Sequence, residues 1–185
     1  MPKTSILLSP APYHVLSYGT LLGTTFFHHI QSFINGFVQF KALPRPQFAA
    51  VQSKLFPIYF GIQSAVPLIL AITYPGGGPH NDSAGITGLL EVGNRWGFLV
   101  PIATMCASGL LNLLILLPAT TKCMAERYSQ ERKDGKKSYD PAPHSQEMLA
   151  LNKRFGKLHG ISSLLNLTTF IAAIVYGVSL SGRLA

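Results

Sequence analysis

The sequence is poor in charged residues, and those it has are unevenly spread. Only 12% of its 185 residues are Asp, Glu, Lys or Arg, whereas 48% are hydrophobic. Four stretches carry no charge at all: 37 residues after Lys3, 27 after Lys54, 26 after Arg95 and 25 after Lys157. A helix needs roughly 20 apolar residues to cross the hydrocarbon core of a bilayer. A soluble domain of this size rarely has four such stretches, so the sequence predicts an all-α integral membrane four-helix bundle.

The expected spans cover about residues 13–40, 55–74, 96–121 and 158–181, and residues 122–157 form a long loop. A chain of this length is expected to form a single domain, residues 1–185. The first uncharged stretch is too long for the roughly 7–15-residue core of a signal peptide. Pro10 and Pro12 also lie where the basic region of such a peptide would be. We therefore expect the first span to be retained.

Cysteine is scarce, which limits disulfide and metal chemistry. The two cysteines are Cys106 and Cys123, and 17 residues of helix would hold them about 25 Å apart. They cannot form a disulfide with each other at that separation. The sequence contains no zinc-binding spacing, so we expect no metal and no cofactor.

The net charge of +8 is explained by membrane orientation rather than by nucleic-acid binding. The loops after the first and third spans hold twelve Lys and Arg residues, whereas the two termini and the remaining loop hold three. Positively charged loops stay preferentially in the cytosol. We therefore expect a multi-pass protein of an endomembrane or the plasma membrane, with both termini lumenal or extracellular. Its expected partners are membrane lipids and not nucleic acid.

The long loop should be mostly helical. Gly135 follows a polar helical stretch, and Ser145 is placed to cap a new helix that runs into the fourth span. This second helix has an apolar stripe among basic residues. It fits either a solvated stalk or a segment that contacts anionic lipid headgroups.

Two further motifs leave alternatives open. Gly19 and Gly23 form a GxxxG pattern, which serves close helix packing within one chain or in a homo-oligomer. Asn81 begins a glycosylation sequon on the expected lumenal side, but it lies so close to the second span that its glycosylation stays open.

Each expected span contains one amide side chain nine or ten residues from the lysine at its cytosolic end. A rise of 1.5 Å per residue puts these amides about 14–15 Å deep, near the middle of a ~30 Å core. An amide in hydrocarbon needs a hydrogen-bond partner. We therefore predict one inward-facing polar layer, which either joins the helices or binds a small ligand. Its members are Gln31, Gln63, Asn112 and Asn166.

Four stretches of sequence carry a family resemblance. They are LPR at 43–45, VQSKLFPIYF at 51–60, PATT at 118–121 and HGISSLLNL at 159–167. In this order they resemble the transmembrane protein 205-like family of small four-span membrane proteins. The resemblance covers nearly the whole chain and implies four helices and a multi-pass location. It carries over a family motif of Leu43, Pro44, Arg45, Lys54, Phe56, Pro57, Tyr59, Pro118, His159, Gly160, Ser163 and Asn166.

The family's link to platinum-drug resistance implies trafficking or export, without a defined substrate. We therefore expect a non-catalytic role in trafficking, scaffolding or small-solute export. The alternative is a cofactor-free membrane oxygenase in which His159 or His28 acts as the base. No carboxylate lies within an expected span to support that chemistry. His159 is therefore interpreted as a structural residue at the membrane interface.

Overall fold

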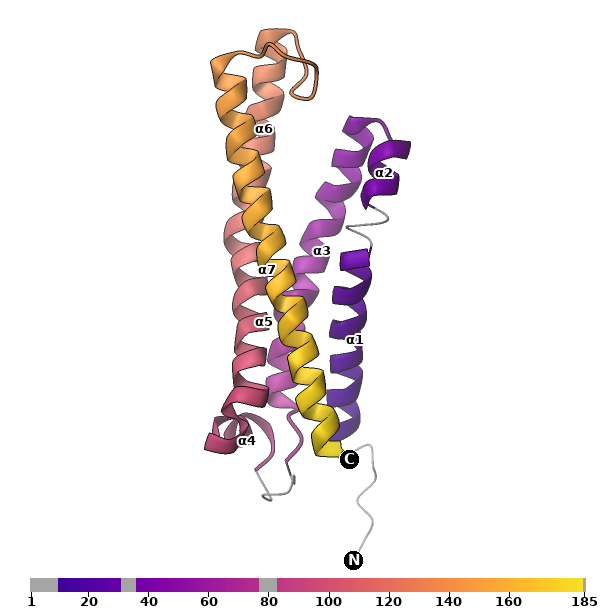
Figure 1. The fold of residues 1–185 in the computed structure, drawn as a ribbon, viewed down its shortest axis with the longest axis vertical. Helices are drawn as coiled ribbons and strands as arrows, with labels where there is room; N and C mark the ends of the chain where they lie inside the picture. The colour runs from indigo at the N-terminus through magenta and orange to yellow at the C-terminus, as the bar shows by residue number, and fades with distance from the viewer. Residues whose placement is uncertain (1–9, 31–35, 77–82, 185) are drawn as a thin grey trace, which may run out of the picture.

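The computed structural model describes residues 10–30, 36–76 and 83–184, which form helices and turns with no strand in these ranges (Figure 1). The predicted all-α class is therefore confirmed. The longer elements are α1 (Pro10–Ile30), α2 (Gly36–Ala42), α3 (Arg45–Ile72), α4 (Gly85–Leu90), α5 (Val100–Leu111), α6 (Leu117–Asp134) and α7 (Gln146–Leu184). Three short turns, η3 (Val92–Asn94), η4 (Arg95–Leu99) and η5 (Asn112–Leu116), join α4, α5 and α6.

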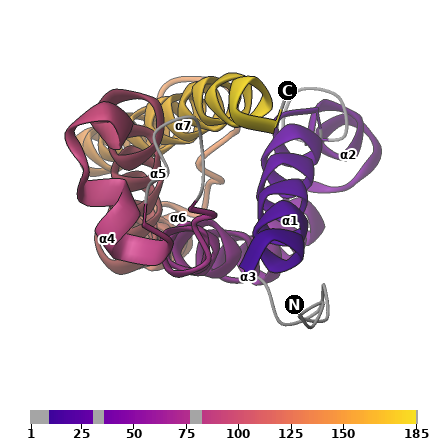
Figure 2. The ribbon, with the colours of Figure 1, turned by 90° about the horizontal axis from the view of Figure 1, so that it is seen from below.

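The long helices pack side by side as a bundle. α5 packs on both α3 and α7, and α1 packs on the same two helices from the opposite side (Figure 2). The chain thus surrounds one shared interior. The C-terminus and the start of α1 lie at one end of the bundle, and the turn between α6 and α7 lies at the other (Figure 1).

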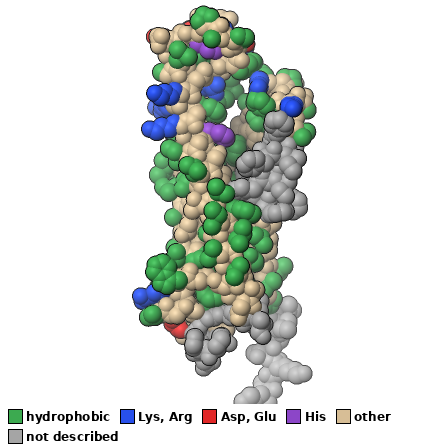
Figure 3. Space-filling view, viewed as in Figure 1, with side chains coloured by type: hydrophobic (Ala, Val, Ile, Leu, Met, Phe, Trp, Pro, Cys, Tyr) green, Lys and Arg blue, Asp and Glu red, His purple; other side chains and the backbone are tan. Residues whose placement is uncertain are grey.

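In the part of the chain that the structure describes, three helices are long and apolar enough to cross a membrane. They are Arg45–Ile72, Val92–Asp134 and Gln146–Gly182. Hydrophobic side chains spread over the middle of the molecule, while Lys and Arg gather toward its ends (Figure 3). The expected first span, 13–40, includes residues 31–35, which lie outside the described ranges. A fourth crossing therefore stays a prediction.

Beyond the apolar segment, α6 and α7 form a helical hairpin. The rod from Val92 to Asp134 has 43 residues and is therefore about 65 Å long, twice the thickness of a hydrocarbon core. Gly135 ends α6 in the left-handed conformation (φ 64°), and the Ser145 hydroxyl accepts a hydrogen bond from the Met148 N–H at 3.2 Å. Both expected helix boundaries of the long loop are confirmed.

Two wide helical turns interrupt the rod, and each stands just before a proline. η4 precedes Pro101, and η5 precedes Pro118. Proline has no N–H to donate to the carbonyl four residues earlier, so the preceding turn rearranges. In η5 the Leu117 N–H bonds to the Asn112 carbonyl five residues back, which is a π-helical turn.

The hydrophobic core cluster lies in the half of the bundle that holds the start of α1 and the end of α7. Aromatic rings form much of it, since Phe98 packs edge-on against both Tyr74 and Tyr176. The other half has fewer buried residues on α3, whose first buried side chain is Tyr59. The polar residues at mid-bundle lie between these two regions.

Candidate functional site: a buried amide cluster

Three of the four predicted amides are buried between α3, η5 and α7. Gln63, Asn112 and Asn166 expose 1%, 0% and 8% of their surface. The Asn112 Nδ2 donates to the Asn166 Oδ1 at 2.9 Å, which joins η5 to α7. Gln31 lies outside the described residues, so its place in the layer stays a prediction.

Gln63 is hydrogen-bonded to Thr169, which is not one of the four predicted amides. Its Nε2 donates to the Thr169 hydroxyl at 2.8 Å. Thr169 is fully buried and lies three residues after Asn166, on the same face of α7. We call Gln63, Asn112, Asn166 and Thr169 the amide cluster.

Gly109 brings α5 close to the backbone of Gln63. A Cβ placed on Gly109 would lie 2.8 Å from the Gln63 carbonyl oxygen and 3.0 Å from the Ser64 nitrogen. Only glycine leaves room for this approach. Pro67 stands four residues after Gln63 and has no N–H to donate to that carbonyl. Asn112 lies one turn beyond Gly109 on the same rod, so the close approach brings it near Gln63.

Two oxygens of the amide cluster have open hydrogen-bonding capacity. The buried Gln63 Oε1 and Asn112 Oδ1 make no hydrogen bond to any described residue. Leaving a buried acceptor without a partner costs about 1–3 kcal/mol. The Gln63 Nε2 and the Asn112 Nδ2, in contrast, each have a partner. The cluster therefore contains two buried acceptors that have no hydrogen-bond partner among the described residues.

A second buried polar group holds α1 to the bundle. His14 is fully buried, and its Nδ1 lies 3.2 Å from the Thr73 hydroxyl at the end of α3. Its Nε2 is hydrogen-bonded to the Tyr176 hydroxyl on α7. The Thr73 hydroxyl donates to the Ile69 carbonyl, so it accepts from the Nδ1–H. The ring therefore has its proton on Nδ1 and accepts from Tyr176 at Nε2, which fits a structural role.

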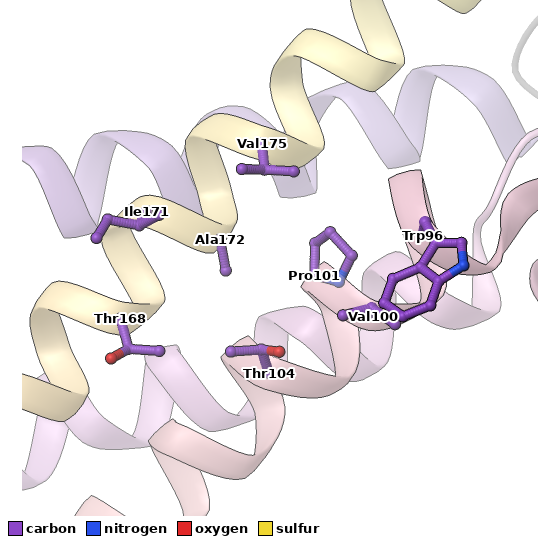
Figure 4. Close-up of a pocket in the computed structure, with 8 residues that line it drawn as sticks. All are labelled: Trp96, Val100, Pro101, Thr104, Thr168, Ile171, Ala172 and Val175. Carbon is purple, nitrogen blue, oxygen red and sulfur yellow. The ribbon is translucent and has the colours of Figure 1, made fainter.

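An apolar groove of about 250 Å³ lies between α5 and α7 (Figure 4). Its hydroxyl-bearing lining residues are Thr104 and Thr168, and the Thr168 hydroxyl donates to the Leu164 carbonyl of its own helix at 2.9 Å. The groove suits hydrocarbon, but it offers few groups that would orient a ligand. Its lining residues are Trp96, Val100, Pro101, Thr104, Thr168, Ile171, Ala172 and Val175.

His159 lies away from the amide cluster. It is exposed, and its ring stacks on Phe155 with centroids 6.0 Å apart and planes 3° from parallel. The side chain of His28 lies outside the described part. Within that part, no three His, Cys, Asp or Glu residues gather into a metal-binding group.

The family-motif residues and the glycine motif do not form one site in the bundle, and their burial differs from residue to residue. A Cβ on Gly19 or Gly23 would meet no described atom within 4 Å, so this motif makes no close helix contact there. A homo-oligomer through these glycines stays a prediction. Of the motif residues, Tyr59 and Asn166 are buried, Leu43, Arg45 and Phe56 are partly buried, and Pro44, Lys54, Pro57, Pro118, His159, Gly160 and Ser163 are exposed.

The fold and the buried cluster define an all-α bundle with helices suited to a membrane and a polar site in its interior. Residues 16–129 match the family described as a domain of unknown function, DUF4149, and the chain belongs to this family. It is 32% identical over 173 residues to the xanthocillin biosynthesis cluster protein D of Aspergillus fumigatus, an alignment that covers 94% of this chain and 90% of the relative. No solved structure matches the chain.

Proposed function

We propose that this is a non-catalytic multi-pass membrane protein that binds a small molecule in the amide cluster and takes part in its trafficking or export. The observation that carries this proposal is the pair of buried oxygens, Gln63 Oε1 and Asn112 Oδ1, which have no partner among the described residues. They lie on different helices, in the region where the sequence places the middle of the membrane.

A ligand accounts for this arrangement better than helix association alone. An amide that serves only to join helices stabilises the bundle most when both its oxygen and its nitrogen are hydrogen-bonded, because lipid offers no replacement partner. Here the nitrogens of Gln63 and Asn112 join the helices, and the oxygens of the same two amides stay open. The π-helical turn that begins at Asn112 is also a feature often found at functional sites.

Two resemblances support a role in small-molecule trafficking. The sequence resembles the transmembrane protein 205-like family, whose link to drug resistance fits export. The Aspergillus relative is named as a protein of the xanthocillin biosynthesis cluster, and our proposal that the present chain handles a small molecule fits that name. We also propose that the present chain crosses the membrane four times.

The site residues favour binding over catalysis. The amide cluster holds amides and one hydroxyl, none of which is a general acid or base at neutral pH. The oxygenase alternative needs a positioned base, and the exposed His159 stacks on Phe155 instead of facing a carboxylate.

Small-molecule content after purification tests the proposal. The wild type, the double variant Gln63→Leu/Asn112→Leu and the control Ser64→Ala would be purified in the same mild detergent, and extracts compared by mass spectrometry. Ser64 is a matched control because it is buried beside Gln63 and its hydroxyl donates to the Phe60 carbonyl of its own helix. We expect one small molecule to be enriched in the wild type and the control and depleted in the double variant. Equal contents in three folded samples would overturn the proposal.

A further inference from the structure

We propose that the ligand of the amide cluster is a neutral molecule that presents a hydroxyl or N–H group to Gln63 Oε1 and Asn112 Oδ1. This inference rests on the proposed function and specifies its ligand class. Both open atoms are acceptors, so the complementary group on the ligand must be a donor.

Thr169 fixes which end of the Gln63 amide stays open. Its hydroxyl donates to the Leu165 carbonyl at 3.1 Å, so that proton is already used. The Thr169 hydroxyl oxygen can still accept a hydrogen bond. The Gln63 atom that lies 2.8 Å from it must therefore be the donor Nε2. Turning the amide over would bring two acceptors together. Gln63 Oε1 is thus held away from Thr169 with its lone pairs open.

Asn112 adds a second acceptor from another helix. Its Nδ2 is engaged by Asn166 Oδ1, which leaves Asn112 Oδ1 open. The contact of Gly109 with the Gln63 backbone brings α3 and the rod together one turn from Asn112. A ligand with two donors, one for each oxygen, would offset the burial cost of both.

The number and charge of the groups argue against other ligand classes. Two neutral oxygens fall short of the six to eight that Ca²⁺ requires, and an isolated cation is costly to place in hydrocarbon. An anion or an ether would bring lone pairs against lone pairs. A water molecule has two donors and is the one small competitor with matching chemistry.

Matched ligand pairs test this inference. The probes are 4-propylphenol against 4-propylanisole, and N-butylacetamide against N-butyl-N-methylacetamide, each pair differing by methylation of the donor. Affinity would be measured from the ligand-dependent shift in thermal unfolding of the full chain in detergent. We expect the donor member of at least one pair to bind the wild type about tenfold or more tightly than its methylated partner. Gln63→Met should abolish that preference, and Ser64→Ala should keep it.

The outcomes separate this inference from the proposed function. Equal affinities within both pairs, or a preference that survives in Gln63→Met, would overturn donor recognition while leaving a binding role standing. No binding of any probe, together with a purified protein free of small molecules, would mean that water fills the site and would overturn both. If Gln63→Met fails to fold, Asn112→Leu provides the second test, with the same expected loss of preference.

Discussion

At the scale of single residues, the contact between Gly109 and Gln63 is the tightest constraint on the amide cluster. Gly109→Ala would place a Cβ 2.8 Å from the Gln63 carbonyl oxygen, a backbone atom that cannot rotate away. We expect the helices to separate and the free energy of unfolding to fall by about 1–3 kcal/mol. Thermal or denaturant unfolding in detergent would measure the change.

Gly61→Ala is the matched control, because it replaces another glycine in the same bundle. A Cβ on Gly61 would meet no atom of the described residues within 4 Å. Alanine also has the higher helix propensity, by up to about 1 kcal/mol, so this variant should be neutral or slightly stabilised. Equal destabilisation by both substitutions would show that the Gly109 contact is not responsible.

The hydrogen bond between Asn112 and Asn166 should appear as energetic coupling. Hydrogen bonds between membrane helices average about 0.6 kcal/mol, with a maximum near 1.7. In a double-mutant cycle, Asn112→Leu and Asn166→Leu should therefore be non-additive by about that amount, because each substitution removes the partner of the other. The pair Asn112→Leu and Gln52→Ala should be additive, since Gln52 bonds to Gln39 instead. Additivity in both cycles would contradict a shared network.

For this site, the sequence could predict how deep the amide side chains lie along the expected membrane spans. Counting residues from the boundary lysines selected Gln63, Asn112 and Asn166, and all three are buried. Rotation about the helix axis decides the partners, and depth alone does not determine it. Thr169 was therefore not predicted as the partner of Gln63, although its place on the same face as Asn166 was a usable signal. His14 and Tyr176 were missed because neither belongs to a recognisable motif.

At the scale of elements, the hydrogen bonds of His14 join α1 to both α3 and α7. His14→Leu would leave the half-buried Thr73 hydroxyl and the buried Tyr176 hydroxyl without their imidazole partner. We expect a loss of about 1–3 kcal/mol and faster hydrogen exchange along α1 than along α5. Thr20→Ala is the control within α1, because the exposed Thr20 hydroxyl bonds to the Leu16 carbonyl of its own helix. A uniform increase in exchange along all helices would contradict a local attachment.

The hairpin of α6 and α7 should lose stability in acid through Glu131. Burial raises the pKa of its carboxyl, but hydrogen bonds from Ser138 and the charge of Lys137 outweigh burial and hold that pKa below its ordinary value of 4.5. The ionised carboxylate therefore contributes its full stabilisation above about pH 4.5. This stabilisation is lost as the pH falls through the lower pKa of the folded state.

Glu131→Gln measures this contribution. The variant should be less stable than the wild type near pH 6, and the difference should shrink as the pH is lowered below 4.5. Thermal unfolding at several pH values would check it. Glu126→Gln is the control, because its pairing with Arg154 at 2.9 Å lies on the surface and such pairs contribute about 0–1 kcal/mol. If the difference in stability between the wild type and Glu131→Gln grew as the pH fell, the stabilising role of the Glu131 carboxylate would be contradicted.

Element boundaries were predictable where a local cap sets them, and less so where packing does. Gly135 and Ser145 end and begin helices through their own backbone and hydroxyl chemistry, which the sequence displays. The wide turns before Pro101 and Pro118 were not predicted. Proline removes a donor in each case, but the sequence does not say whether the helix kinks or widens in response.

At the scale of the whole molecule, charge-free stretches sufficed to predict an all-α bundle, because only a helix satisfies its own backbone in hydrocarbon. They did not predict which helices are neighbours. The arrangement in which α5 and α1 each pack on α3 and α7 depends on contacts such as those of Gly109 and His14. Those contacts join residues far apart in the chain, and no local pattern reveals them.

The orientation of the bundle in the membrane is the last prediction. Twelve of fifteen Lys and Arg residues lie in the loops after the first and third expected spans, and the structure puts the turn between α6 and α7 at the end opposite the C-terminus (Figure 1). Basic loops remain cytosolic, so both termini should face the lumen or the exterior. In sealed vesicles with the cytosolic face outward, protease should spare tags at both ends and cut one inserted after Gly135. Neutralising six basic residues of the α6–α7 hairpin should weaken this preference. Cleavage of both terminal tags from the cytosolic side would reverse the assignment, and cleavage of just one would mean an odd number of crossings.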